Sequence, residues 1–372
     1  MNKVNLTKYN MCTGKLEPVS DNSLGLESGS VIIPGFADVH THGVAGFEFE
    51  DASAASIETM LKTYARLGTV YVMPTLGTVG LEQIHTATDN ILSAVVKTEG
   101  ADGYARVLGI HYECRYLSPV KAGAHDKSLL KNPSIDEAAV LIDKVASASE
   151  RLGRRLHVHF TIAPELDGGS EFIKYAASRA ATVGIGHSDA DAEAAMAALG
   201  AGAVSFTHTF NAMRPIHHRN SSALTAALIS DAYAEIICDG RHILPEAVKL
   251  FSLAKSEDRA VLITDSVGAG IPEGEEFEFL SHKARVCGGV AVQSDGTIAG
   301  SVISMADGFR NYIDFTGVTV EKAIRAATVN PLNMVGSTEL VEERYESLKD
   351  FAVLDSTGKL KAVYINGKTV QG

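Results

Sequence analysis

Cysteine is scarce in this chain of 372 residues, and its spacing excludes two kinds of site. The 4 cysteines lie far apart and form no Cys-x-x-Cys pair, so the sequence indicates neither a disulfide framework nor a zinc site built from thiolates. Scattered single cysteines favour a reducing compartment, and we expect a cytoplasmic protein. The four positions are Cys12, Cys114, Cys238 and Cys287.

Long apolar runs are also missing. No stretch approaches the ~18 uninterrupted apolar residues that a membrane-spanning helix needs. The segment from Met1 to Leu6 lacks the apolar centre of a signal peptide. We therefore expect a soluble protein that is neither secreted nor embedded in a membrane.

The chain has no excess of positive charge. Lys and Arg number 33 against 45 Asp and Glu, which gives a formal net charge of -12. This balance gives no general attraction to nucleic acid or to an anionic membrane, so we expect neither as a partner. An anionic small molecule would need a local basic pocket.

The chain can nevertheless form a full core. Hydrophobic residues make up 45% and charged residues 21%, as is usual for a globular enzyme. Its length suits one large α/β barrel with a small appendage, or two ordinary domains.

Apolar strand-like segments alternate with helical patterns along most of the chain. This alternation predicts parallel βα units, and eight strands favour a closed (β/α)8 TIM-like barrel over an open doubly wound sheet. We expect the barrel to span residues 34–344. The predicted strands are 36–40, 69–75, 106–113, 155–161, 183–187, 203–208, 234–238 and 260–265.

The two ends of the chain contain shorter strand-like segments, each too small to fold alone. We expect residues 1–33 and 345–372 to pair in one small β domain. Residues 283–300 predict a β hairpin inserted after the eighth barrel strand, with its turn at 294–297.

Two histidines end the first predicted strand, after a Pro34-Gly35 turn. Side chains two apart in a strand point the same way, so His40 and His42 would present two imidazoles to one point. Taken alone, such a tripeptide is as compatible with a surface or hairpin position as with a metal site.

Polar side chains also end other predicted strands. The carboxyl ends of barrel strands open on one face, where active sites of this fold lie, so these side chains would converge. Histidine at one strand end is usually structural, but six coincident positions indicate a metal site. Imidazole and carboxylate ligands suit one or two divalent ions, with Zn2+ or Fe2+ as first candidates beside Co2+ and Mn2+. The six are His40, His42, Glu113, His187, His208 and Asp265.

The first strand reads Pro-Gly-Phe-x-Asp-x-His-x-His and resembles the first metal motif of the amidohydrolase superfamily. Later segments resemble the N-acetylglucosamine-6-phosphate deacetylase family in the same motif order, from about residue 33 onward. The most specific of them is Asn211-Ala212-Met213, which follows a metal-type histidine. Others are 109–113, 121–125, 161–165, 186–188, 264–265, 299–301 and 330–331.

This resemblance implies a role for each matching residue. Glu113, His187 and His208 match the principal metal ligands, and His40 and His42 match a second site that some members lack. Asp265 matches the catalytic acid/base, and His125 matches the contact to the acetyl carbonyl. The contacts to the sugar phosphate would be Asn211, the Ala212 backbone, Arg219 and His242.

The implied activity is hydrolysis of the N-acetyl amide of N-acetyl-D-glucosamine 6-phosphate. The resemblance also implies a homodimer. The loop 211–219 either completes a phosphate pocket across the dimer interface or folds back on its own barrel. Two enzymatic alternatives remain: N-acetylgalactosamine-6-phosphate deacetylation and another amidohydrolase activity. A non-catalytic scaffold would be expected to have lost ligands, and none of the six is lost.

Three segments depart from the family pattern. Cys114-Arg115 replaces the usual Gly-Pro after the glutamate ligand, 44–50 replaces an acidic loop that contains methionine, and the N-terminal strand segment is short for the family. These changes lie beside the predicted site, so the exact sugar and the catalytic efficiency stay open. Arg115 is either a new anion contact or an ordinary surface arginine.

Overall fold

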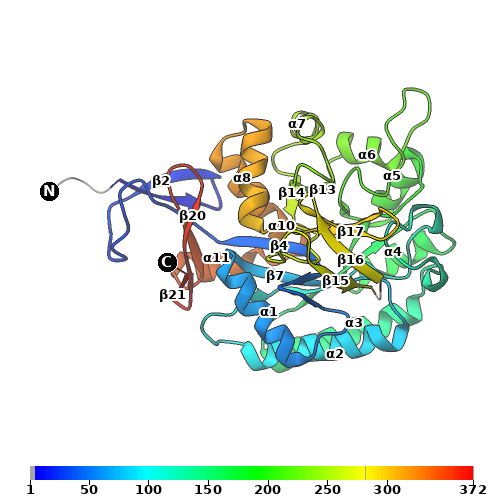
Figure 1. The fold of residues 1–372 in the computed structure, drawn as a ribbon, viewed down its shortest axis with the longest axis horizontal. Coiled ribbons are helices and arrows are strands. Elements are labelled where there is room, and N and C mark those ends of the chain that lie inside the picture. The colour runs from blue at the N-terminus through cyan, green and yellow to red at the C-terminus, as the bar shows by residue number, and fades with distance from the viewer. Residues whose placement is uncertain (1–4, 281, 372) are drawn as a thin grey trace.

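The computed structural model describes residues 5–280 and 282–371. The remaining residues, 1–4, 281 and 372, lie outside the described part, and 1–4 and 372 belong to the predicted β domain. The centre of the structure is a parallel sheet in which eight strands follow one another around a barrel (Figure 1). A short further strand, β8 (Arg106–Val107), pairs with β7. The eight are β4 (Phe36–Thr41), β7 (Thr69–Leu76), β9 (Gly109–Tyr112), β10 (His157–Ile162), β11 (Thr182–Ile185), β12 (Ser205–Phe206), β13 (Tyr233–Ile237) and β14 (Ala260–Ile263).

Contacts between the first and last strands close the barrel. The backbone N–H of Asp265, just after β14, donates to the carbonyl of His40 on β4 over 2.9 Å. The hydroxyl of Thr264 donates to Asp38 Oδ2 over 2.6 Å, so a buried carboxylate ties the same two strands together. The predicted TIM-like barrel is confirmed.

Three predicted strands extend two residues too far, because the polar residues after their ends turn away from the strand direction. The predicted strands 183–187, 203–208 and 260–265 end in the structure at residues 185, 206 and 263. Beyond these ends, His187, His208 and Asp265 have φ angles of 45°, 29° and 48°. Such positive values are incompatible with a strand and are unusual for residues other than glycine.

Helices pack around the barrel, and the longer ones, such as α3, bury one face. In α3, the hydroxyl of Ser134 accepts a hydrogen bond from Glu137 N at the start, and Gly153 ends the helix with a φ of 65°. No helix in the described part of the chain combines the length and apolarity required to cross a membrane. The helices are α1 (Ala54–Arg66), α2 (Leu81–Thr98), α3 (Ile135–Leu152), α4 (Gly169–Ser178), α5 (Ala192–Ala201), α6 (Ala223–Ile229), α7 (Pro245–Ala254), α8 (Met305–Thr316), α9 (Val320–Ala327), α10 (Val329–Val335) and α11 (Thr338–Glu346).

The two ends of the chain share a second, six-stranded sheet, seen beside the barrel in Figure 1. The hydroxyl of Tyr345 on α11 donates to the carbonyls of Tyr9 and Ile32 and ties this sheet to the last helix. A small β domain made from both termini is therefore confirmed, while its boundaries at residues 33 and 345 stay a prediction. In spatial order the strands are β2 (Lys15–Val19), β1 (Leu6–Asn10), β3 (Val31–Ile33), β19 (Phe351–Leu354), β20 (Leu360–Ile365) and β21 (Lys368–Gln371).

A four-stranded antiparallel sheet is inserted between β14 and α8, and we call residues 276–301 the insertion sheet. It contains the predicted hairpin but starts earlier in the chain. Leu280 N donates to Glu48 Oε2 over 3.2 Å and joins this sheet to the small hairpin of β5 (Gly43–Val44) and β6 (Phe47–Glu48). Its strands are β15 (Glu276–Phe279), β16 (His282–Cys287), β17 (Val290–Gln293) and β18 (Ile298–Ser301).

Candidate active site

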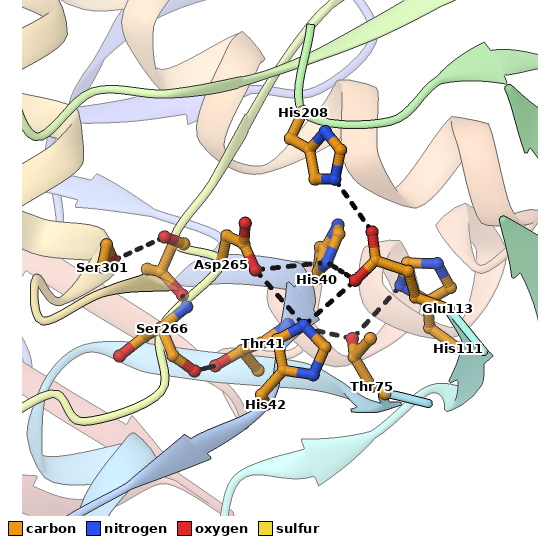
Figure 2. A network of polar contacts seen from close by, with 12 residues as sticks. His40, Thr41, His42, Thr75, His111, Glu113, His208, Asp265, Ser266 and Ser301 are labelled. Atoms are coloured by element: carbon orange, nitrogen blue, oxygen red, sulfur yellow. Dashed lines mark hydrogen bonds and ion pairs between the residues drawn. The ribbon is translucent and has the colours of Figure 1, made fainter. Parts of the chain in front are cut away.

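The Glu113 carboxylate, directly after β9, is the centre of a buried polar cluster (Figure 2). Its Oε2 lies 3.1 Å from Nε2 of His40 and 3.1 Å from Nε2 of His42. Its Oε1 lies 2.9 Å from Nε2 of His208 and 3.3 Å from Nε2 of His187. The structure thus brings all five predicted ligands together at the carboxyl ends of the strands.

Asp265 lies on the solvent side of the same cluster. Its Oδ1 is 3.4 Å from His40 Nε2 and 3.3 Å from His42 Nε2, and its side chain is 13% exposed. The positive φ of this residue turns its side chain away from the strand direction and toward the histidines. A positive φ in a residue other than glycine is a strained conformation. It persists where the surrounding structure fixes the residue, often at an active site.

Charges within the cluster outweigh the effect of burial. Burial by itself would lower the pKa of His40, but Glu113 and Asp265 raise it well above its ordinary value. Burial would raise the pKa of Glu113, yet His40, His187 and His208 lower it well below the usual range. The pKa of Asp265 is lowered too, because His40 and His42 overcome its burial. Both carboxylates are therefore ionised at neutral pH.

The residues present fit a divalent cation. Ligand atoms of His40, His42, Glu113 and Asp265 all lie within 4.8 Å of one another. Nitrogen and oxygen donors without thiolates suit Zn2+, Fe2+, Co2+ or Mn2+.

The outer ring nitrogens of two histidines support this interpretation. Nδ1 of His187 donates to the carbonyl of Lys121 over 2.7 Å, and Nδ1 of His40 lies 3.1 Å from Glu235 Oε2. When a cation replaces the proton on Nε2, an imidazole bonded in this way keeps its other proton on Nδ1 and presents the lone pair of Nε2 inward.

His125 is near the cluster but differs from it chemically. Burial, followed by the charge of His187, lowers the pKa of His125 to about 3, so its ring is neutral. Thr78 N donates to Nδ1 of this ring over 3.3 Å, and an N–H group can only donate. With Nδ1 accepting, the remaining proton is on Nε2, so His125 can donate a hydrogen bond at the cavity that it lines.

A cavity of about 160 Å3 leads to the cluster. It is smaller than the roughly 300–1,000 Å3 of typical ligand pockets, so it would enclose only one end of a sugar phosphate. Asn211, Ala212 and His242 line it together with the cluster, as does Phe279 of the insertion sheet. His242 is held by Asp239, whose Oδ2 lies 2.6 Å from its Nδ1.

Arg219 lies elsewhere in the structure. It is outside the set of described residues that line the cavity, and it belongs to an exposed loop of residues 214–220. Its predicted contact with the phosphate stays a prediction. Arg115 lies with its Nε 3.6 Å from Glu137 Oε2 and is only 15% exposed, which favours a structural ion pair over an anion contact.

Sequence reasoning missed four residues that hold the site residues in place. Glu235 and Glu50 contact His40 and His42, whereas Thr78 contacts His125 and Asp239 contacts His242. One signal was available, because Glu235 is a charged residue in the apolar segment 233–237, and a buried carboxylate needs a partner. The others lie in loops, where no periodicity indicates their direction.

A family model described as "Amidohydrolase family" matches residues 31–370. This chain belongs to that family. It is 33% identical to N-acetylglucosamine-6-phosphate deacetylase from Bacillus subtilis over 86% of this chain and 79% of that protein. It is 31% identical to N-acetylgalactosamine-6-phosphate deacetylase from Escherichia coli over 95% of this chain and 91% of that protein.

A solved structure shares the fold of the amidohydrolase described here. It is a mutant of N-acetyl-D-glucosamine-6-phosphate deacetylase from Mycobacterium smegmatis in complex with N-acetyl-D-glucosamine-6-phosphate. The TM-score is 0.83, with 27% sequence identity over 99% of each chain.

Proposed function

We propose that this chain hydrolyses the N-acetyl amide of N-acetyl-D-glucosamine 6-phosphate to D-glucosamine 6-phosphate and acetate. The observation that carries the proposal is the meeting of three groups at one cavity: ionised Asp265, neutral His125 and the Glu113 cluster. Support also comes from relatives that are deacetylases of phosphorylated acetamido sugars.

Asp265 is placed to move protons. An ionised carboxylate at the cavity accepts a proton from the attacking water, and the oxygen of that water adds to the carbonyl carbon. As the bond between carbon and nitrogen breaks, the same carboxyl group returns the proton to the departing amine. The products are one acetate and one amino sugar phosphate.

His125 and the cavity walls orient the substrate. The Nε2–H of His125 donates to the carbonyl oxygen and stabilises the negative charge that develops there. Asn211, the Ala212 backbone and His242 hold the sugar phosphate, so that the acetamide end enters the cavity. Fixing the amide in this way lowers the entropic cost of reaction.

Glu113, His187 and His208 would hold one divalent ion, and His40 and His42 would hold a second with Glu113. When bound, such an ion supplies Lewis acidity, which polarises the carbonyl group and lowers the pKa of water. We propose Zn2+ or Fe2+ because the ligands are imidazoles and carboxylates.

N-acetyl-D-galactosamine 6-phosphate is the second candidate substrate, favoured by the similarity to the Escherichia coli enzyme. The two sugars differ in the orientation of one hydroxyl group, and the same chemistry serves both. Measuring kcat/KM for acetate release from each of them tests the choice. We expect a higher value for the glucosamine compound, and a higher value for its epimer would reverse the assignment.

We further propose a cytoplasmic homodimer in which Arg219 of one protomer reaches the phosphate in the cavity of the other. Arg219 lies outside the lining of its own cavity, within the described residues. Ile216 of the same loop is 50% exposed, while Met213 is buried at its base. Apolar and basic side chains together suit an interface core with a functional polar edge.

A further inference from the structure

Two buried glutamates lie behind the His40–His42 pair, and no step of the proposed mechanism uses them. Glu235, in the middle of β13, is 0% exposed, and Glu50, after β6, is 3% exposed. Glu235 Oε2 lies 3.1 Å from His40 Nδ1, and Glu50 Oε1 lies 3.5 Å from His42 Nδ1. Each histidine therefore has a carboxylate on the side opposite to Glu113.

Both glutamates are themselves fixed by the backbone. Glu50 Oε1 accepts a hydrogen bond from Gly77 N over 2.5 Å, after β7. Glu235 Oε2 accepts one from His208 N over 3.2 Å, at the strained turn that follows β12. A carboxylate with a second, rigid partner cannot rotate freely, so it fixes the imidazole that it faces.

The other two histidines of the cluster have weaker support. His187 Nδ1 donates to a neutral backbone carbonyl, that of Lys121. His208 Nδ1 is buried and has no partner within the described part of the chain. Among the described residues, carboxylates therefore contact Nδ1 of His40 and His42 but not Nδ1 of His187 and His208. A carboxylate behind a ligating imidazole sets its tautomer and orientation and makes Nε2 a stronger donor to a cation.

We propose that Glu235 and Glu50 are positioning residues that keep the His40–His42 half of the cluster as a tight divalent cation site. This inference rests on the metal-dependent function proposed above. The two residues act through the histidines and do not touch substrate. The contact of Glu50 with His42 is longer than that of Glu235 with His40. Loss of the Glu50 carboxylate should therefore weaken cation binding less than loss of the Glu235 carboxylate.

The test is a Zn2+ titration of the full chain, with chelator competition to resolve tight binding. We expect two ions per wild-type chain. In Glu50→Gln and Glu235→Gln one of the two dissociation constants should rise, by about 10–100-fold for Glu235→Gln, as is typical for the loss of such a partner. Glu235 also holds the backbone of His208, whereas Glu50 contacts His42 and no other histidine in the described part of the chain. Glu50→Gln therefore isolates the His40–His42 half.

Glu48→Gln is the matched control. Glu48 lies two residues before Glu50, is 9% exposed and accepts a hydrogen bond from Leu280 N, but contacts no histidine of the cluster in the described part of the chain. Burial, followed by the charge of Glu50, raises the pKa of Glu48 to about 9, so glutamine leaves the charge at neutral pH unchanged. We expect wild-type Zn2+ binding, and weakened binding would show a general effect of the loop and overturn the inference.

The Tm of the metal-free protein separates positioning from a structural role. A structural role would lower that Tm in Glu235→Gln and leave both dissociation constants unchanged, which would contradict the inference. Should Glu235→Gln fail to fold, Glu50→Gln alone decides the result. A wild-type chain that binds no Zn2+ would refute the metal-dependent function itself. Two unaltered sites in both glutamine variants would refute only the positioning role.

Discussion

Asp265 is the most exposed side chain of the cluster, at 13%, and it lines the cavity that would admit substrate. Replacing it with asparagine removes the proton acceptor while retaining the side-chain shape. We expect kcat for Asp265→Asn to fall by about 10²–10⁴-fold or more, the range for loss of a general acid/base. Metal content should stay at the wild-type level, as measured by elemental analysis. Turnover close to wild type would remove Asp265 from the mechanism.

His125 accepts a hydrogen bond at Nδ1, and its Nε2–H is the proposed donor to the carbonyl oxygen. For His125→Ala we expect kcat to fall by about 10²–10³-fold, the usual effect of removing one oxyanion donor. Zn2+ stoichiometry should be unaltered. Since His125 lies within ligand distance of Glu113 and His187, loss of one ion in this variant would identify it as a ligand and contradict the assignment.

The main site residues could be predicted from sequence because each lies at or just beyond the end of an apolar strand, and the strand determines the position of the side chain. His40, Glu113 and His208 are of this kind. The direction in which a loop side chain points cannot be predicted in this way. Thr78 and Asp239 act through single hydrogen bonds whose geometry depends on tertiary packing, so sequence gave no means of finding them.

The strands themselves show where periodicity stops being informative. Apolar residues and a following histidine predict one continuous strand, but the positive φ at His187 and His208 ends each strand two residues earlier. The insertion sheet was predicted only from its last turn. Its first strand, β15, alternates charged and aromatic residues, and its pairing with β16 depends on contacts made within the folded sheet.

Asp350 joins the terminal sheet to the barrel. Its buried carboxylate accepts from Arg106 on β8 over 3.2 Å and from Asn366 N, before β21, over 2.9 Å, and it also pairs with Arg344 on α11. For Asp350→Asn we expect the free energy of unfolding to fall by about 3–5 kcal/mol, the usual cost of breaking a buried ion pair. Chemical denaturation measures this. Asp102→Asn, which removes an exposed pair with Lys368, should have a clearly smaller effect, and equal effects would contradict the prediction.

The same carboxylate gives a dependence on pH. Burial would raise the pKa of Asp350, but Arg344 and Arg106 lower it below its ordinary value of about 3.8. A group with a lowered pKa in the folded state contributes its full stability above the unfolded value and loses it as pH falls through the folded value. The stability difference between wild type and Asp350→Asn should therefore be constant near neutral pH and shrink below about pH 4. A difference that grows on acidification would have the wrong sign.

Assembly of the whole molecule determines whether the phosphate site is complete within one chain. If Arg219 acts across an interface, Arg219→Ala should mainly raise KM for the phosphorylated sugar. Mixing inactive Asp265→Asn chains with Arg219→Ala chains should restore partial activity, because each mixed dimer contains one site with both residues. Mass measurement in solution checks the dimer. A fully active monomer would refute the dimer as a requirement, and no restoration in a confirmed dimer would place Arg219 in the site of its own chain.

The most direct measurement is acetate and free amine released from N-acetyl-D-glucosamine 6-phosphate by purified chain before and after metal removal. We expect the two products in equal amounts, loss of turnover after chelation, and recovery on adding Zn2+ or Fe2+ to the wild type but not to Asp265→Asn. Unphosphorylated N-acetyl-D-glucosamine should react with a higher KM, because it lacks the phosphate that we propose Asn211, the Ala212 backbone and His242 hold. Full turnover by the chelated protein, or no acetate from metal-loaded wild type, would contradict a metal-dependent deacetylase that uses Asp265.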